Sequence, residues 1–437
     1  MDVVKRQMLN TPLTVSTIDY WKAQWYNFKD AAVSFTFDDG YRSHFETLAP
    51  MLEQLGFRGT FYIITNWVGK GETPSWDTLT AIAARGHEIG SHTKNHTNLE
   101  TLAFSMYNLL FVDSAIVEMD SSKEMINRNI FPEKCETMAF PFGATSYNAI
   151  LLAKSFYISC RGSGYILQPS TPYNFYNVQC KGISPDTTLL QMNAWIDRLQ
   201  YTKGWLIERI HGIDSNGWEP VPSSRYASHL GYVKLNEDHL WIDTYKNVIK
   251  YIRERNNAKL SLIDSTLYDY TLSLTDTLAD DIYNVPITLK VRLKSGNMVN
   301  LVSITQAGKQ IDFIEKYDNG KLYVTFNAVP DAGDIKFNIQ NVISVFHDNV
   351  SSDLMLECYP NPVNSTSMVS YFLGRNSQVV LSVFNSEGSL MSTIVNEKVK
   401  AGVYSVELNA DDFPNGVYFL CLQAEKKKEV TRIVVVK

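Results

Sequence analysis

The stretch Ala32-Val-Ser-Phe-Thr-Phe-Asp-Asp-Gly40 decides how the first half of the chain folds. Apolar residues alternate with Ser and Thr from 32 to 37, which predicts a short strand, and Asp38-Asp39-Gly40 is a turn signal at its end. An amphipathic helix is predicted next, because apolar residues recur at helical spacing before a glycine at 56: Leu48, Met51, Leu52 and Leu55. A buried strand followed by a covering helix is the unit of an α/β fold.

The same alternation of strands and helices continues to about residue 262. Strands are predicted at 60–64, 87–90, 137–140, 156–160, 205–210 and 259–263, and helices near 77–85, 146–154, 189–199 and 245–252. Repeated alternation of this kind favours a parallel sheet, which is most simply closed into a barrel. In such a barrel the chemistry lies where the strands end.

Length and composition limit the remaining possibilities. At roughly 150 residues per domain, 437 residues predict about three domains. A hydrophobic share of 45% and a charged share of 20% are typical of a globular protein, and a net charge of −6 without a long basic run gives no indication of a nucleic-acid partner. No apolar run reaches the roughly 18 residues of a membrane span. The five cysteines are widely spaced and odd in number, which favours buried thiols over a disulfide framework.

From about residue 264 the pattern changes to strict alternation of apolar and polar residues. Pro286–Leu293 and Lys321–Phe326 are clear examples, and turn residues separate such segments. This predicts a β-sandwich over 263–350 and a second one over 351–437. The predicted fold class is therefore an α/β barrel domain over 1–262, followed by two small all-β sandwich domains. We expect the three units to be separable, with the chemistry confined to the first.

Two groups of residues near predicted strand ends have the composition of a metal site. Asp38 and Asp39 follow the first strand, and His92 and His96 lie four residues apart after the extended segment at 87–90. Imidazoles at positions i and i+4 share one face of a helical turn and converge on one cation. An ordinary Asp-Asp-Gly turn and two unrelated surface histidines are the alternative interpretations. Because each group supports the other, we expect the Asp pair to provide a third ligand and a general base.

Two further motifs follow predicted strands. Phe140-Pro-Phe-Gly143 is a rigid turn whose backbone N–H groups are suited to a developing oxyanion. The strand at 205–210 delivers His211 to the same edge of the sheet as a candidate general acid. Taken singly, each motif is as compatible with a structural role as with a functional one. Their combination and order along the chain make the pattern specific.

These motifs together resemble the polysaccharide deacetylase family, the NodB-homology carbohydrate esterases. The resemblance covers roughly 31–263 and includes the segment Leu240-Trp-Ile-Asp-Thr-Tyr245. It implies a distorted (β/α) barrel and a metal-dependent hydrolase that removes acetyl groups. It also implies one divalent cation, with Zn²⁺ as the expected metal. The implied roles are metal binding for Asp39, His92 and His96, base for Asp38, backbone oxyanion donor for Phe142, and acid for His211.

The sequence departs from the family pattern in two places. The usual Arg before the Pro-aromatic-Gly turn is absent from Met138-Ala-Phe140, and no Asp-x-x-Asp-Trp stretch is found to support the acid. Arg161 is therefore a candidate partner of the base from a neighbouring strand, or a substrate-binding residue. Asp214 and Asp186 are candidates for orienting His211. A plain surface salt bridge is the alternative for each of them.

The turn-rich loop after His211 contains a large aromatic residue, Trp218, close to the candidate acid. We expect this side chain to stack on a sugar ring or to form a wall for the acetyl methyl group. Trp67, in the loop after the second strand, is a weaker candidate for the same role. Packing beneath the loops is the alternative for both residues.

The C-terminal unit carries a second resemblance, to a type A sorting domain of the type IX secretion system. It rests on Tyr359-Pro-Asn-Pro362, Ala401-Gly-Val-Tyr404, Pro414-Asn-Gly-Val-Tyr-Phe419 and the closing segment Thr431–Lys437. It implies a secreted or cell-surface protein that engages the secretion machinery, and a native signal peptide that is absent from this sequence. An unrelated sandwich is the alternative. The middle unit resembles no family, so a spacer and a weak carbohydrate-binding module are both open.

The leading hypothesis is a metal-dependent deacetylase of an extracellular acetylated polysaccharide or oligosaccharide, either acetyl-xylan or an N-acetylglucosamine polymer. The alternative is a catalytically degenerate carbohydrate-binding surface protein, which the intact metal and acid–base residues disfavour. A structural surface protein is the third hypothesis. Bound metal together with the release of acetate would separate the first from the other two.

Overall fold

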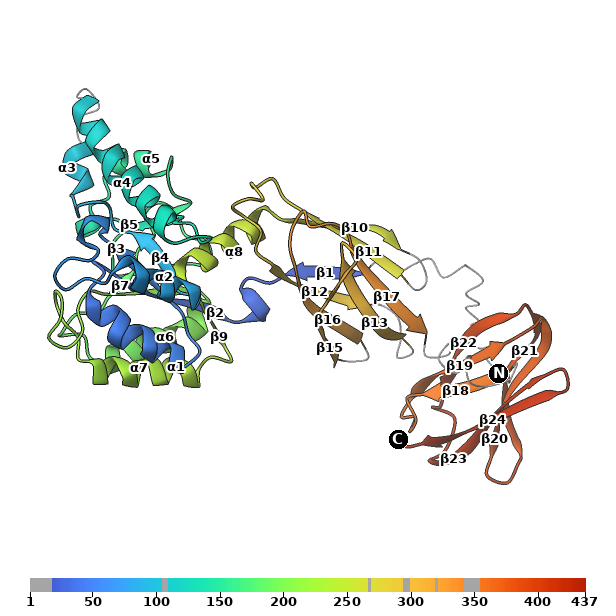
Figure 1. The fold of residues 1–437 in the computed structure, drawn as a ribbon. Helices are drawn as coiled ribbons and strands as arrows, with labels where there is room; N and C mark the ends of the chain where they lie inside the picture. The colour runs from blue at the N-terminus through green and yellow to red at the C-terminus, as the bar shows by residue number, and fades with distance from the viewer. Residues whose placement is uncertain (1–17, 104–108, 266–268, 294–298, 319–320, 342–353) are drawn as a thin grey trace.

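The computed structural model describes residues 18–103, 109–265, 269–293, 299–318, 321–341 and 354–437 (Figure 1). Within these ranges the chain forms a parallel α/β barrel and several antiparallel β-sheets, so the predicted fold class is confirmed. Within the described ranges, no helix has the length and apolar character needed to cross a membrane.

The barrel consists of short parallel strands. They are β2 (Ala31–Phe37), β3 (Gly59–Ile63), β4 (Glu88–Ser91), β5 (Thr137–Ala139), β6 (Ser159–Arg161), β7 (Lys181–Gly182), β8 (Trp205–Ile210) and β9 (Leu240–Ile242). Their order is β6-β5-β4-β3-β2-β8-β7, and β9 pairs with the start of β2. A parallel bridge between Arg161 and Val178, just before β7, joins the two ends of this order. The barrel is distorted on that side, because β7 has only two residues.

Helices pack against these strands, and all but the last share one hydrophobic cluster with them, whereas the last belongs to the cluster of the sandwich. They are α1 (Ala49–Gln54), α2 (Trp76–Ala84), α3 (Leu99–Ala103), α4 (Leu109–Asn129), α5 (Tyr147–Ala153), α6 (Leu189–Thr202), α7 (Ser223–Leu235) and α8 (Tyr245–Asn257). Short 3-10 or π segments precede α1 or follow strands, at η1 (Tyr26–Phe28), η2 (His44–Leu48), η3 (Thr65–Trp67) and η4 (Pro141–Gly143). The predicted helices are all present, whereas α3, α4 and α7 were not anticipated.

The middle region of the chain forms two antiparallel sheets. The first has the order β1 (Asp19–Lys22), β12 (Ile287–Leu293), β16 (Lys321–Ala328) and β15 (Phe313–Asp318). The second has the order β10 (Lys259–Ser265), β11 (Asp269–Thr275), β17 (Ile335–Asn341), β13 (Val299–Gln306) and β14 (Lys309–Ile311). Inward residues of both sheets belong to one hydrophobic cluster, as expected for a sandwich.

The strand predicted at 259–263 exists but does not belong to the barrel. It is the start of β10, which pairs antiparallel with β11 in the sandwich. The strand that pairs with the start of β2 is β9 instead, with Ala31 opposite Leu240. In the same way β1, which precedes the barrel in the chain, pairs with β12 (Figure 1). The sandwich is therefore built from chain on both sides of the barrel.

The barrel and the sandwich also share apolar contacts. One hydrophobic cluster contains Ala32 and Trp205 from the barrel, Ile252 from α8, and Leu289 and Phe337 from the sandwich. The domain boundary predicted at 262/263 falls inside β10. It remains a prediction, and the boundary predicted at 350/351 lies outside the described residues.

The C-terminal region forms two further antiparallel sheets around a core of its own. One contains β18 (Leu354–Tyr359), β19 (Thr366–Leu373) and β22 (Gly402–Asn409). The other contains β21 (Leu390–Val399), β20 (Ser377–Asn385), β23 (Gly416–Ala424) and β24 (Lys427–Val435). Alternate residues of these strands are buried, as in Val379, Leu381 and Val383 of β20, which is the pattern of a sandwich.

Candidate active site and metal centre

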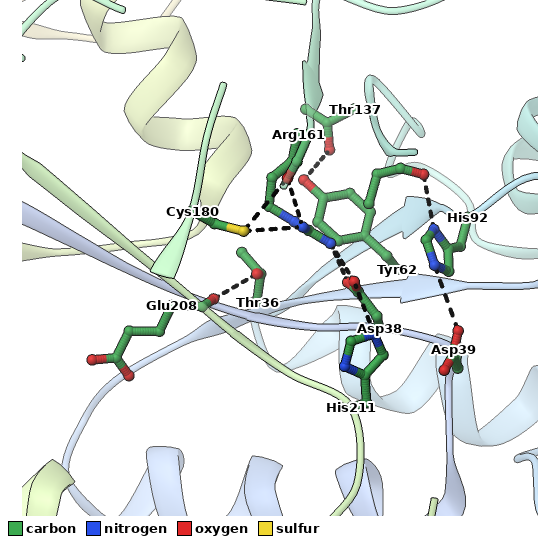
Figure 2. Close-up of polar contacts among 12 residues, drawn as sticks. Thr36, Asp38, Asp39, Tyr62, His92, Thr137, Arg161, Cys180, Glu208 and His211 are labelled. Carbon is green, nitrogen blue, oxygen red and sulfur yellow. Dashed lines mark hydrogen bonds and ion pairs between the residues drawn. The ribbon is translucent and has the colours of Figure 1, made fainter. Parts of the chain in front are cut away.

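The residues selected from the sequence meet at the carboxyl ends of the barrel strands. They follow or end five different strands, and parallel strands direct their carboxyl ends to one edge of the sheet. The strands involved are β2 for Asp38 and Asp39, β4 for His92, β5 for Phe142, β6 for Arg161 and β8 for His211. Figure 2 shows this convergence, with Asp38 between Arg161 and His211 and with His92 beside Asp39.

Asp39, His92 and His96 form a cluster with the composition of a metal site. One ligand atom from each of the three residues lies within 4.8 Å of those of the other two. The Nε2 atoms of His92 and His96 lie 3.5 and 3.4 Å from Asp39 Oδ1. Asp39 Oδ1 is buried and has no hydrogen-bond partner among the described residues. A buried carboxylate oxygen without a hydrogen bond is costly unless a cation completes its surroundings.

The tautomer of His92 also fits metal binding. Its Nδ1 lies 2.8 Å from the carbonyl oxygen of Ala139, which can only accept a hydrogen bond. Nδ1 must therefore carry the proton, which leaves a lone pair on Nε2, the atom that faces Asp39. Burial lowers the pKa of His92 and of His96, which favours the neutral imidazoles that bind metals. The residues present fit a divalent cation.

The expected helical turn at His92–His96 is not formed. These residues follow β4 in an irregular loop, and the two rings nevertheless lie 4.9 Å apart. Thr93 and His96 adopt left-handed backbone angles, with φ of 65° and 61°, and this conformation turns the second imidazole back toward the first. The i, i+4 spacing thus correctly predicted the proximity, but for the wrong reason.

Asp38 and Arg161 form a buried ion pair next to this cluster. Arg161 Nη2 donates to both carboxylate oxygens of Asp38, and both side chains are almost completely inaccessible to solvent. Burial by itself would raise the pKa of Asp38, but the charges of Arg161 and the nearby His92 hold it well below its usual range. Of the two roles predicted for Arg161, the geometry agrees with the partner of the base. Its burial does not suit contact with a substrate.

His211 lies on the other side of Asp38, with Nε2 3.8 Å from Asp38 Oδ2. Neither predicted orienting carboxylate reaches it. Asp214 accepts a hydrogen bond from the Ser223 backbone N–H instead, and His211 Nδ1 is buried without a partner among the described residues. Asp186 lies on the exposed surface, away from this network. Burial lowers the pKa of His211 to about 3, so its imidazole is neutral in the resting site.

The Pro-Phe-Gly turn has a strained backbone. Phe142 adopts φ 57°, and Gly143 follows with φ 64°, where a Cβ atom would also overlap the Ser163 side chain. Gly143 N–H donates to Phe140 and Ala144 N–H donates to Pro141, so these two groups are used within the turn. The Phe142 ring is exposed and lies 4.5 Å from the ring of His96.

Two tryptophans flank this group of residues. Trp218 is 56% exposed, and its ring meets the ring of His211 edge-on at 4.7 Å. Trp67 is 38% exposed and lies 5.9 Å from the ring of His96. Neither is packed beneath its loop, so the alternative of simple packing does not account for them.

Sequence reasoning did not identify three residues that hold the site in place. Tyr41 lies beside Asp39, and burial together with the Asp39 charge raises the pKa of its hydroxyl to about 12. Glu118 of α4 accepts hydrogen bonds from Asn95 N at 2.8 Å and Asn95 Nδ2 at 2.6 Å, inside the histidine loop.

The third residue is His44, whose Nε2 donates to the His211 carbonyl oxygen. Its ring is buried, and burial lowers its pKa to about 4, so it remains a neutral donor. The short spacing from the Asp-Asp-Gly turn to Tyr41 and His44 was a usable signal. No sequence signal pointed to Glu118, because it lies on α4, 23 residues after its partner Asn95.

Comparisons with known proteins agree with this geometry. Residues 26–159 match the family model described as polysaccharide deacetylase, and residues 357–437 match the model described as secretion system C-terminal sorting domain. Both predicted resemblances are confirmed. Residues 26–159 are thus similar to this family, and the match at 357–437 points to secretion or to the cell surface.

Individual relatives cover limited parts of either protein. The chain is 26% identical over 385 residues to a gellan lyase of a Bacillus species, which is 80% of this chain but 15% of that protein. It is 36% identical over 72 residues to a chitin deacetylase of Colletotrichum lindemuthianum, or 16% of this chain and 29% of the relative. The chain therefore spans well under two thirds of these relatives.

Among solved structures, the Xyl-CE4 domain of a multidomain xylanase from a Trinervitermes trinervoides hindgut metagenome aligns with 50% of this chain and 90% of that one, at 16% identity and a TM-score of 0.36.

Proposed function

We propose that the barrel is a metal-dependent deacetylase that removes acetyl groups from an extracellular polysaccharide. One observation carries the proposal: a buried Asp-His-His cluster lies beside a buried Asp–Arg pair and a histidine, all at one strand edge. A purely structural barrel has no need for an unpartnered buried carboxylate oxygen next to two neutral imidazoles. Functional sites are where such arrangements concentrate.

Asp39, His92 and His96 would hold a divalent cation, with Zn²⁺ as the expected metal. Three protein ligands leave room for water and substrate, which is the arrangement of catalytic rather than structural metal sites. When bound, the cation would lower the pKa of a water molecule and polarise the acetyl carbonyl group. Tyr41 and Glu118 would keep the ligand loops in position.

Asp38 would accept the proton of the attacking water. Arg161 holds its carboxylate rigidly, and this fixes the direction of its oxygen atoms. A neutral His211 must gain a proton before it can donate one. Its Nε2, 3.8 Å from Asp38 Oδ2, is close enough to receive that proton and pass it to the departing sugar atom.

The Phe142 N–H would donate to the oxyanion that forms on the acetyl carbonyl oxygen. A left-handed residue fixed between a proline and a glycine offers a preorganised donor, which needs no rearrangement during the reaction. Trp218, next to His211, would provide an apolar surface for a sugar ring or for the acetyl methyl group.

Two substrate classes remain candidates. The similarity to a chitin deacetylase supports an N-acetylglucosamine polymer, and acetyl-xylan is the second candidate. The sorting domain supports delivery outside the cell by the type IX secretion machinery, so the substrate would be an extracellular glycan.

Release of acetate from acetyl-xylan, chitin oligomers and peptidoglycan tests the proposal. We expect release from at least one of them, loss of release after chelation, and recovery when zinc is added. In His92→Ala, we expect bound zinc and acetate release to fall together, because one of three ligands is lost. Unchanged zinc content in this variant would refute the ligand assignment. Tight zinc binding without acetate release from any substrate would favour a degenerate binding protein.

A further inference from the structure

The sheet β1-β12-β16-β15 has an outer face whose side chains do not contribute to the core. Its inward residues, including Leu289, Val291 and Val324, are fully buried. The residues between them point the other way, because side chains alternate along a strand. The outer face combines rings and cations, and we call it the aromatic–cationic face: Trp21, Phe28, Lys290, Arg292, Lys316 and Tyr323.

Register places these residues in adjacent rows across the sheet. Trp21 lies opposite Lys290, and Tyr323 lies between Arg292 and Lys316. The rings of Trp21 and Tyr323 are 6.4 Å apart and inclined by only 33°, so they form a nearly continuous platform. Trp21 and Phe28 remain 43% and 40% exposed. Exposed rings grouped on a flat sheet are typical of a binding surface.

One cation of this face, Lys290, lies against two of its rings. Lys290 Nζ lies 4.8 Å from the centroid of Tyr323 and 5.6 Å from that of Phe28. Within the described ranges, Lys290 and Lys316 form no ion pair, and Arg292 pairs with Asp19 while its Nε has no hydrogen-bond partner. These rows thus carry three cations against one carboxylate, although the whole chain has a net charge of −6.

We propose that the aromatic–cationic face is a second glycan site, which binds an acidic polysaccharide containing uronic acid units. The apolar face of a sugar ring stacks on an aromatic platform, and carboxylates of the same chain pair with Lys290, Arg292 and Lys316. Charge complementarity selects this ligand over a neutral glycan. The proposed site shares no residue with the candidate active site. The proposal therefore does not depend on the barrel being a deacetylase.

The position of the face relative to the barrel suits this role. Trp21 belongs to β1, and Phe28 belongs to η1, which leads directly into β2 of the barrel. Phe28 thus lies on the short connection between β1 and β2, and Figure 1 shows β1 within the sandwich sheet beside β12. A polymer bound on this face is held by a sheet that shares an apolar cluster with the barrel, and this raises the local concentration of the polymer at the candidate active site.

Affinity gel electrophoresis of the full chain tests the site, with polygalacturonate as the acidic probe and unsubstituted xylan as the neutral one. We expect polygalacturonate to retard the protein, and added salt to weaken the effect. Trp21→Ala should weaken binding roughly tenfold or more, as expected for a central aromatic contact. Lys290→Gln should remove most of the preference for the acidic polymer, and Lys290→Arg should keep it. Tyr201→Ala is the matched control, because Tyr201 is an exposed aromatic residue on α6 outside this face.

Acetate release from chitin oligomers measures the activity of the barrel independently of glycan binding on the aromatic–cationic face. It should be unchanged in Trp21→Ala. The melting temperature of each variant shows whether the sandwich remains folded. Polygalacturonate binding that is the same in the wild type, Trp21→Ala and Lys290→Gln would overturn the proposal. Equal retardation by xylan would overturn the acidic assignment. Self-association that Trp21→Ala abolishes would instead identify a second copy of the chain as the occupant.

Discussion

The two ends of the barrel are built from opposite kinds of contact. At the carboxyl ends of the strands, a buried ion pair, neutral imidazoles and left-handed residues such as Asp39 and Phe142 lie together. At the amino ends, Trp241 lies 6.3 Å from Trp25 and 5.0 Å from Tyr251, in an apolar cluster that continues into the sandwich. The carboxyl end contains buried polar groups and strained residues, whereas the amino end buries large aromatic side chains.

This difference suggests how the chain tolerates its active site. Unsatisfied polar atoms and left-handed residues reduce stability, each by an amount on the order of 1–3 kcal/mol. The aromatic end compensates through burial of large side chains, and it does so together with the sandwich. Stability and chemistry are therefore separated in space along the same strands. Because the two regions share this apolar cluster, we expect the sandwich to support the fold of the barrel.

The largest effect is expected from cutting the chain at Asp264. A fragment that ends there separates β10 from β11 and removes β12, the partner of β1. It also exposes apolar residues of α8 and of the barrel floor. We expect it to be insoluble or unfolded by circular dichroism, whereas a fragment that ends at residue 341 should fold and keep the barrel's activity. A well-folded, active 1–264 fragment would show that the sandwich is dispensable.

Asp38→Asn should be the most damaging substitution that leaves the fold intact. The amide cannot accept a proton from water, so acetate release should fall by about 10²-fold or more. The metal ligands are unchanged, so zinc content should remain at the wild-type level. Rates close to those of the wild type would exclude Asp38 as the base, and a loss of zinc would indicate that Asp38 is itself a ligand.

Trp218→Ala should have a smaller effect that depends on the substrate. Trp218 is exposed beside His211, so its loss removes a stacking surface without removing a proton-transfer group. We expect KM for a polymer to rise roughly tenfold, with a lesser change in kcat. Tyr173→Ala, which removes another highly exposed ring, serves as the control. Unchanged kinetics on polymers would mean that Trp218 does not contact the substrate.

The smallest effect concerns the pH dependence of stability at the amino end. Burial and the nearby carboxylates of Asp276 and Asp280 raise the pKa of Glu254 to about 9, and this residue accepts from the Val285 N–H across the junction. In the unfolded chain the ordinary value is 4.5. Between these values the folded chain keeps a proton that the unfolded chain loses, so stability declines as the pH rises through this window.

Glu254→Gln keeps the acceptor for Val285 and removes the titration. We expect its melting temperature to match that of the wild type near pH 4.5 and to exceed it near pH 8, by an amount on the order of a few degrees. Parallel melting curves of both proteins across this range would show that Glu254 is ionised in the folded chain.

The predictions from sequence were most accurate where the signal was local. Strands and helices with a regular apolar stripe were found, and so were the motifs directly after strands. The helix α4 was missed because its buried stripe includes Ala115 and Ser122, which give little hydropathy contrast. The helix α7 was missed because Tyr226 and His229 interrupt its apolar face. Polar residues buried by tertiary partners are invisible to a pattern of hydrophobicity.

Long-range partners were the other source of error. His211 was expected to be oriented by Asp214 or Asp186, but its backbone is held by His44, the first residue of η2. The strand at 259–263 was correctly expected, but its sheet was not, because β9 already occupies the position beside β2. Neighbouring strands in space need not be neighbours in the chain.

The sequence by itself determined which residues stand at the ends of the barrel strands, because each motif lies within a few residues of its own strand. Only the tertiary structure decided what those residues contact. Arg161 reaches Asp38 because the barrel curves β6 and β2 toward a common interior, so an arginine on another strand can neutralise the base. Trp21 and Tyr323 form one platform because β1 and β16 both pair with β12, although they come from opposite sides of the barrel in the chain. Such pairings depend on the closure of sheets, which no local pattern encodes.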